Sequence, residues 1–379
     1  MQPDKPASPE SAPPNTSRLT LRRLHRAMSD LRRGVPVLID DAAPLLVLAA
    51  ETAGQDGFAE LKAFGNTAPL FIVPAARAAA ILRLPMPENT PSVAIELLDP
   101  SDEPALFAAL ADPVARQPSI RDRARIAPTP PAAEAAVQLA KIGRLLPAVL
   151  AVPLPADRRL DIDRSSLLTV PASDVLAYAD HDAHGLRQIV SAEVPLTDAP
   201  DSRVVAFRSE GSAVEHLAIV IGRPEAQPAP LVRLHSECFT GDLLGSMRCD
   251  CGEQLRGAIR RMAEDGAGVL LYLAQEGRGI GLVNKLRAYG LQDRGLDTMD
   301  ANRVLGWGAD ERNFLVGATM LRLMGISRVR LLTNNPDKVE GMQACGIEVT
   351  DREPHLFAPN GVNDEYLATK AARFGHMLD

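Results

Sequence analysis

Residues 235–252 have the sequence HSECFTGDLLGSMRCDCG, and the second half of the chain is best understood outward from this stretch. It contains Cys238, Cys249 and Cys251, three of the four cysteines of the chain, in a C-x10-C-x-C pattern. Clustered cysteines outside a disulfide framework indicate metal binding or catalysis. Because thiolates are typical zinc ligands, the spacing predicts a zinc site.

The spacing alone leaves three interpretations of these cysteines open. Three ligands with an open position would activate water, whereas a structural zinc needs a fourth ligand, for which His235 is a nearby candidate. Ordinary buried cysteines are the third interpretation. In the first interpretation, a zinc ion with an open position, the three thiolates give the site a formal charge of about −1. A bound water is then acidified less than at a three-histidine site. A nearby cation such as Arg248, or a separate base, would then be needed.

A glycine-rich segment, QEGRGIGL at 275–282, follows the apolar, strand-like VLLYLA. Its glycines let the backbone approach a ligand closely, and Arg278 suits a phosphate. The segment is neither a Rossmann fingerprint nor a P-loop, and a tight turn would explain it equally well when taken alone.

Two further segments are ambiguous by themselves. Asp310 in ADERNF (309–314) is compatible with a helix N-cap followed by a solvated arginine. In LLTNNPDK (331–338), Thr333 and Lys338 flank a turn that suits phosphate oxygens or has no ligand at all.

Length and composition limit the protein class. A chain of 379 residues with 46% hydrophobic and 23% charged residues predicts a globular protein of about two domains. It has no apolar run of the roughly 18 residues that a membrane span needs, and its net charge of −7 argues against a nucleic-acid partner. The Pro- and Ser-rich residues 1–17 predict a disordered tail without a signal peptide, so we expect a cytoplasmic protein.

The order of elements predicts the α/β (α+β) class. We expect a helix and two strands over 18–52, then a helix at 132–143 and a strand at 147–154. Residues 203–209 and 215–222 predict a β-hairpin, and from Gly266 strands alternate with helices as in a mixed sheet with covering helices. The expected division is a domain at 18–181, a linker at 182–202 and a second domain at 203–379.

Taken together, the segments are no longer independent. HSECFTGD and RCDCG, QEGRGIGL, KLRAYGLQD, LDT, ADERNF and LLTNNPDK occur in an order and spacing that resemble GTP cyclohydrolase II throughout the second domain. The resemblance implies that Cys238, Cys249 and Cys251 hold one zinc ion per chain. The positions that it implies for GTP binding are Arg233, Leu234, His235, Ser236, Glu237, Gln254, Glu276, Gly277, Arg278, Thr298, Thr333 and Lys338.

The same resemblance implies three catalytic residues. Asp310 would be the proton acceptor, Arg312 the nucleophile on the α-phosphate, and Tyr289 a helper at the ring. A guanidinium is an unusual nucleophile because its pKa exceeds about 12, so stabilisation of transition-state charge is a competing role for Arg312.

The implied reaction opens the guanine ring of GTP with water activated by zinc, attacking C8. Formate and pyrophosphate leave, and the product is 2,5-diamino-6-ribosylamino-4(3H)-pyrimidinone 5′-phosphate, at the first step of riboflavin synthesis. We expect Mg²⁺ on the triphosphate. The family also implies a homodimer. A non-catalytic nucleotide-binding paralogue and a related cyclohydrolase of another pathway are the alternatives.

The first domain resembles 3,4-dihydroxy-2-butanone 4-phosphate synthase, but without the acidic loop of that family. Asp40 and Asp41 are followed directly by Ala42, Ala43 and Pro44, and PPAAEA around Glu134 replaces the family's G-H-T-E segment. A site without these carboxylates and histidine cannot hold Mg²⁺ or enolise a sugar phosphate. We therefore expect a degenerate, non-catalytic domain whose removal leaves the chemistry of the second domain largely in place.

Overall fold

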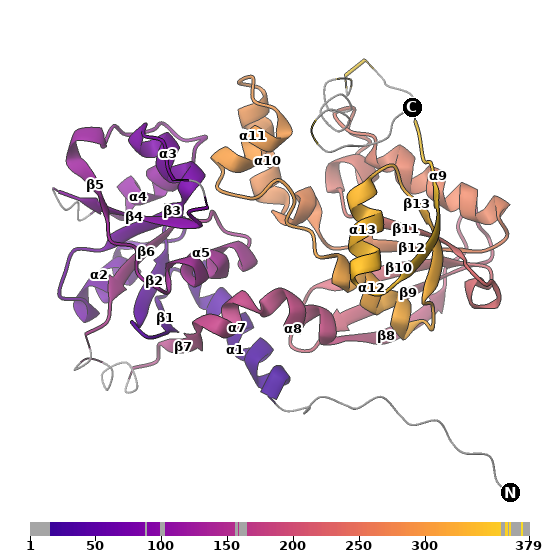
Figure 1. Cartoon of the computed structure of the whole chain (residues 1–379), viewed down its shortest axis with the longest axis horizontal. Coiled ribbons are helices and arrows are strands. Elements are labelled where there is room, and N and C mark those ends of the chain that lie inside the picture. Colours follow the sequence, from indigo (N-terminus) through magenta and orange to yellow (C-terminus); the bar gives the residue numbers. More distant parts are fainter. Residues whose placement is uncertain are drawn as a thin grey trace, which may run out of the picture.

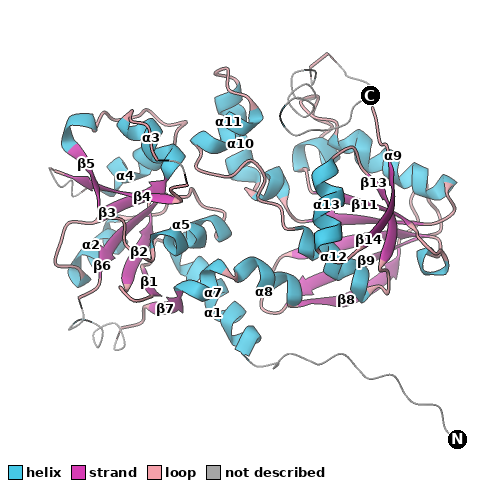
Figure 2. Cartoon of the chain, viewed as in Figure 1, coloured by secondary structure: helices cyan, strands magenta, loops and turns pink. Residues whose placement is uncertain are grey.

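The fold consists of two seven-stranded sheets with helices on their faces, joined by a helical segment (Figure 1, Figure 2). The computed structural model describes residues 16–87, 89–98, 103–155, 158, 165–357, 361–362, 364 and 373. The predicted α/β class is confirmed. Residues 1–15 of the expected tail lie outside the described residues, and the first helix begins at Thr16.

The first sheet has the strand order β5-β4-β3-β6-β2-β1-β7, and all neighbours except β1 and β7 are antiparallel. Strand β2, LLVLA, lies between β6 and β1 and is buried along its whole length, as a strand between two covered faces must be. The strands are β1 (Val37–Asp40), β2 (Leu45–Ala49), β3 (Leu70–Pro74), β4 (Ser92–Leu97), β5 (Ala124–Ala127), β6 (Val149–Pro153) and β7 (Leu168–Pro171). The helices are α1 (Thr16–Arg32), α2 (Gln55–Phe64), α3 (Ala75–Leu82), α4 (Pro104–Ala111), α5 (Ala133–Ile142), α7 (Ala172–Leu176) and α8 (Tyr178–His184).

The second sheet has the order β14-β13-β11-β12-β10-β9-β8. Its strands are β8 (Leu186–Glu193), β9 (Ser202–Ser209), β10 (Glu215–Ile221), β11 (Leu231–Ser236), β12 (Gly268–Leu273), β13 (Arg328–Leu332) and β14 (Glu348–Glu353). Its helices are α9 (Cys251–Glu264), α10 (Leu282–Gln292), α11 (Thr298–Val304), α12 (Phe314–Leu323) and α13 (Pro336–Ala344). Short single turns occur at Phe239–Leu243 and Glu276–Gly279.

Three neighbouring strands of the second sheet, β13, β11 and β12, run parallel. Parallel strands end at the same edge of a sheet, where α/β proteins bind ligands. The loops that follow these strands contain the cysteine segment, the glycine-rich segment and the TNNPDK turn. The sheet topology thus brings together three segments that are about 40 to 100 residues apart in the sequence.

Most sequence predictions of elements agree with the structure, and one does not. The hairpin at 203–222 is present as β9 and β10, and helix α5 and strand β6 occupy the expected positions. Residues 182–202, however, are not simply a linker, because they contain the end of α8 and the whole of β8. Strand β8 is an edge strand with only Leu186 buried, so its sequence lacks the apolar alternation by which a strand is recognised.

The apolar cores lie on the faces of the two sheets. One buried cluster of the first sheet also includes side chains from residues 280–307, which belong to the second half of the chain. Among the described helices, none combines the length and apolar character needed to cross a lipid bilayer.

Candidate active site

A cavity of about 760 Å³ opens at the carboxyl ends of β11, β12 and β13. Every residue that the sequence assigns to metal, substrate or catalysis lines this cavity except Asp310. The lining includes Arg233, Leu234, His235, Ser236, Glu237, Cys238, Cys249, Cys251, Gln254, Glu276, Gly277, Arg278, Tyr289, Thr298, Arg312, Thr333 and Lys338.

The three cysteines of the predicted metal site converge. The sulfur atoms of Cys238, Cys249 and Cys251 all lie within 4.8 Å of one another, and those of Cys238 and Cys249 are 3.7 Å apart. A tetrahedral zinc with Zn–S bonds of about 2.3 Å separates its sulfur ligands by about 3.8 Å. The geometry therefore fits zinc. Among the described residues, this is the one group of three or more potential ligands close enough to hold a metal.

Gly241 makes this convergence possible. A Cβ atom at Gly241 would lie 2.7 Å from Cys249 Sγ and 3.0 Å from Cys238 Sγ, which is too close for any real side chain. The loop between the cysteines therefore needs glycine at this point so that it can wrap around the three sulfurs.

Lys285 of α10 supplies positive charge to the thiol group. Its Nζ donates hydrogen bonds to Cys238 Sγ at 3.0 Å and to Glu276 Oε1 at 2.8 Å. Burial favours a neutral lysine, but these two hydrogen bonds outweigh it and raise the pKa of Lys285, so the side chain stays charged. Hydrogen bonds from Cys249 and Cys251, and then from Lys285, hold the pKa of Cys238 well below its usual range. The buried ammonium thus favours the thiolate form that metal binding requires.

Glu276 fixes the cysteine loop. Its Oε2 accepts a hydrogen bond from the Phe239 amide at 2.7 Å, and its Oε1 accepts from the Gly277 amide and from Lys285. Both carboxylate oxygens are engaged by the protein, and the residue is buried. Glu276 therefore joins the glycine-rich loop to the metal-binding loop.

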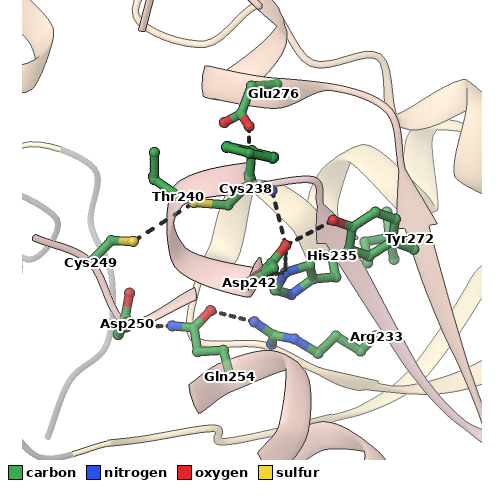
Figure 3. A network of polar contacts seen from close by, with 12 residues as sticks. Arg233, His235, Cys238, Thr240, Asp242, Cys249, Asp250, Gln254, Tyr272 and Glu276 are labelled. Carbon is green, nitrogen blue, oxygen red and sulfur yellow. Dashed lines mark hydrogen bonds and ion pairs between the residues drawn. The ribbon is translucent and has the colours of Figure 1, made fainter. Parts of the chain in front are cut away.

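Asp242 is the centre of a second network (Figure 3). Its carboxylate accepts hydrogen bonds from the Cys238 amide at 2.9 Å and from the Tyr272 hydroxyl at 3.0 Å, and it contacts His235 Nε2 at 3.1 Å. His235 is not part of the thiol group, so it is not placed as a fourth ligand. Burial lowers the pKa of His235 despite the neighbouring carboxylate. The network holds β11 and the cysteine loop in one arrangement.

Arg233 is a buried cation on the cavity wall. Its Nη1 donates to the Leu332 carbonyl at 3.1 Å, and its Nη2 donates to Gln254, whose amide in turn donates to Asp250 (Figure 3). Burial lowers the pKa of Arg233 to about 10, so it is still charged at neutral pH. Its Nε is buried and has no hydrogen-bond partner within the described residues.

Asp310 and Arg312 form an ion pair at the cavity rim. Arg312 Nε donates to both carboxylate oxygens of Asp310, at 2.8 and 3.0 Å. Asp310 does not cap a helix, because α12 begins at Phe314 and its N-cap is Asn313. Burial favours a protonated Asp310, but Arg312 outweighs it and lowers the pKa of the carboxyl. Arg312 lines the cavity, whereas Asp310 does not.

Tyr289 lies between the thiol group and the rim. Its hydroxyl is 3.5 Å from Thr240 Oγ1, and the Arg248 guanidinium stands 4.9 Å from its ring centre. Arg248 also pairs with Asp293 at the end of α10. The sequence proposed Arg248 as the cation that assists the metal, but Lys285 is the residue that contacts a cysteine sulfur.

On the opposite wall, hydroxyl and ammonium groups face the cavity. Thr333 is buried and accepts a hydrogen bond from the Asn335 amide, and Lys338 Nζ donates to the Leu234 carbonyl at 2.8 Å.

In the glycine-rich loop, Arg278 has a left-handed backbone with φ of 63°. Gly279, at φ of 98°, approaches so closely that a Cβ would lie 2.9 Å from the Glu311 carbonyl oxygen.

Sequence reasoning missed Lys285 and Asp242 as parts of the site. Lys285 stands in the quoted KLRAYGLQD segment, and Asp242 lies between the cysteines, but neither has a spacing that signals contact with a sulfur or a loop amide. Both contacts depend on tertiary packing.

Comparison with known proteins agrees with this geometry. Residues 187–354 match the family model of GTP cyclohydrolase II. A GTP cyclohydrolase-2 of Azospirillum brasilense is 45% identical, and the alignment covers 98% of this chain and 99% of that protein. The chain belongs to the GTP cyclohydrolase II family. The family is one of enzymes, and the similarity to the Azospirillum relative extends over both sheets.

Two other comparisons concern the division of the chain. A GTP cyclohydrolase-2 of Citrobacter koseri is 49% identical and covers 51% of this chain but 98% of its own length. Among solved structures, a two-domain 3,4-dihydroxy-2-butanone 4-phosphate synthase of A. baumannii covers 88% of this chain and 98% of its own, with 16% identity and a TM-score of 0.34. A likeness of this size carries no conclusion about the first sheet.

Proposed function

We propose that this chain is a zinc-dependent GTP cyclohydrolase II. It hydrolyses GTP to 2,5-diamino-6-ribosylamino-4(3H)-pyrimidinone 5′-phosphate, formate and pyrophosphate, at the start of riboflavin synthesis. The observation that supports this most is the single cavity that brings a three-thiol group together with buried arginine, lysine and threonine side chains. Such a cavity offers one end to a metal and the other to phosphates.

At the thiol end, the chain's own residues prepare the site. When bound there, zinc supplies the Lewis acidity that activates a water molecule for attack on the guanine ring. The Lys285 ammonium offsets part of the negative charge of the three thiolates through its contact with Cys238. We infer that Tyr289, which lines the same cavity, orients the ring by its hydroxyl.

At the other end, we infer that Thr333, Lys338 and Arg278 bind the triphosphate, assisted by Mg²⁺. Arg312 then meets the α-phosphate, either as nucleophile or as a stabiliser of developing charge. Arg312 is paired with Asp310 in the structure, and we infer that GTP binding brings the α-phosphate to this pair. The Asp310 carboxylate then serves as the proton acceptor.

The remaining parts of the proposal concern assembly and the first domain. We infer a homodimer, which is supported by the exposed Leu243 and Leu244 on the cysteine loop, 71% and 64% exposed. We also infer that the domain at 18–181 is non-catalytic. Sedimentation or light scattering on the purified chain tests the dimer.

Product analysis tests the reaction. Purified, zinc-loaded chain is incubated with GTP and Mg²⁺, and formate, pyrophosphate and the pyrimidine product are measured. Equal amounts of formate and pyrimidine are expected. GTP binding without formate release would favour a non-catalytic nucleotide-binding paralogue, and a different pyrimidine would favour a cyclohydrolase of another pathway.

A further inference from the structure

Helices α10 and α11 belong to the second half of the chain but pack on the first sheet. Figure 1 shows them between the two sheets. Their apolar side chains join the same buried cluster as strands β1 to β4 and β6. The helices contribute Ala288, Leu291 and Ala301, and the adjoining segments contribute Ile280, Leu305 and Trp307.

Polar contacts also fix α10 to loops and helix ends of the first domain. Arg287 donates to Glu51 at 2.7 Å and to Asp112 at 3.1 Å, and all three side chains are largely buried, with 18%, 19% and 25% exposed. Its neighbour Asn284 is fully buried and donates to the Arg144 carbonyl at 3.3 Å. An ion pair removed from water in this way is costly to break by removing one partner, because the remaining charge stays buried.

The first domain also holds the loops next to the catalytic pair. Lys141 pairs with Glu311 at 2.6 Å, and the Glu311 amide donates to the Arg278 carbonyl at 3.1 Å. Arg144 donates to the Ala274 carbonyl at 2.9 Å, directly before the glycine-rich segment. The segment with Asp310 and Arg312 is thus attached to the first domain by its middle residue, Glu311.

The opposite side of α10 faces the thiol group. Successive helical residues are about 100° apart, so Arg287 is about 200° around the helix from both Lys285 and Tyr289. Lys285 contacts Cys238, and Tyr289 lines the cavity. A shift of α10 away from the first sheet must therefore move both side chains relative to the sulfurs.

We propose that the first domain, although without chemistry of its own, positions the active site of the second through α10. Glu51 and Asp112 are then positioning residues for a reaction that takes place on the far side of the helix. This inference rests on the proposed function for its kinetic consequence. It reverses the expectation that the second domain works largely unchanged when the first is removed. A shorter family member without the first domain must support its own α10 in another way.

The test uses the full chain with Glu51→Gln and Asp112→Asn combined. These changes remove both charges but keep the oxygens that accept hydrogen bonds from the Leu146 and Val114 amides. The matched control is Glu96→Gln, which neutralises a carboxylate of the same sheet that pairs with Arg125 away from α10. Glu51 and Asp112 do not line the cavity.

Four readouts are combined: kcat, KM, the fluorescence of Trp307 and the rate of zinc release. The double variant should lose roughly 10- to 100-fold in kcat, since misplacement of a reacting group by about 1 Å has effects of this size. Its KM for GTP should change little, because Thr333 and Lys338 lie on the opposite wall. Trp307, the single tryptophan of the chain, is buried at this interface beside Lys141, so its fluorescence should shift to the red. Zinc should be released to a chelator faster, because Lys285 moves away from Cys238.

A second pair of variants covers the case in which the double variant does not fold. Arg287→Lys keeps a charge between the two carboxylates and should retain more kcat and slower zinc release than Arg287→Ala. Shifted Trp307 emission with wild-type kcat and wild-type zinc release would overturn the positioning role. Lack of GTP turnover by the unaltered chain would contradict the proposed function instead, and the zinc-release rates would still decide the positioning role.

Discussion

The two seven-stranded sheets of this chain are equal in size and differ in how their strands run. In the first sheet only β1 and β7 are parallel, whereas β12, β11, β13 and β14 of the second form a continuous parallel block. Antiparallel hairpins send consecutive loops to opposite edges, and parallel strands send them to one edge. The difference explains why, in the part of the chain that the structure describes, the three metal-binding cysteines and the polar side chains around them gather at the second sheet.

The loops of the two sheets also differ in the side chains that they contain. The connection between β1 and β2 consists of Asp41, Ala42, Ala43 and Pro44, and Asp41 accepts a hydrogen bond from the amide of Ala42. The connection after β11 contains two of the three cysteines, the buried Asp242 network and the glycine that lets them converge. The first sheet has a packed core, and the loop between β1 and β2 lacks metal-binding side chains beyond Asp41, which fits the proposed positioning role.

The largest effect is expected at the metal site of the second sheet, and it should leave the first sheet unaffected. Cys249→Ser should remove the zinc and abolish turnover, because the site depends on all three thiolates. The first sheet should remain folded, so the far-ultraviolet circular dichroism should change little. Metal analysis and formate release measure the effect. Cys345→Ser, outside the cavity, is the control, and full zinc content in the Cys249 variant would contradict the metal assignment.

A smaller but still large effect is expected at the rim. Asp310→Asn should lower kcat by about 10²-fold or more if Asp310 accepts a proton. Arg312→Lys should fail in a similar way, since an ammonium cannot reproduce the planar fork of a guanidinium. Single-turnover assays measure both. The control is Arg328→Lys, in an exposed ion pair with Glu348 on the same sheet, and near-native turnover of either rim variant would remove its catalytic role.

The residues in these two predictions could be identified from the sequence, whereas Lys285 and Glu51 could not. Cys249 stands in a cysteine pattern whose spacing itself indicates a metal site, whereas Asp310 and Arg312 are identified through the resemblance of their segment to the family. Lys285 and Glu51 carry no such signal, because their roles depend on which face of α10 meets which sheet. Strand β8 was missed for a related reason, since an edge strand that exposes most of its side chains has no apolar alternation.

The smallest expected effect is a loss of folding stability at acidic pH, which arises from buried histidines of the second sheet. Burial lowers the pKa of His216 and His355, both packed with the second sheet, to about 4. In the unfolded chain these groups bind protons below a pH of about 6.5, so their contribution to stability is complete above that pH and is lost as the pH falls toward 4. Going from pH 7 to 5 should lower the free energy of unfolding by about 2 kcal/mol for each histidine.

Urea unfolding at the two pH values measures this effect. His355→Gln should reduce the pH dependence, and His184→Gln, at an exposed position in α8, should leave it unchanged. An equal pH dependence in both variants would show that the buried histidine contributes nothing to the acid sensitivity of the second sheet.

The central claim is that the second sheet does all the chemistry of the chain and the first does none. The most direct measurement supplies the purified, zinc- and magnesium-loaded chain with GTP and, separately, with ribulose 5-phosphate, and quantifies the products of both. The account predicts formate and the diaminopyrimidine from GTP, and no 3,4-dihydroxy-2-butanone 4-phosphate above a no-enzyme control. Butanone phosphate formed from the sugar phosphate, or an absence of formate from GTP, would contradict it.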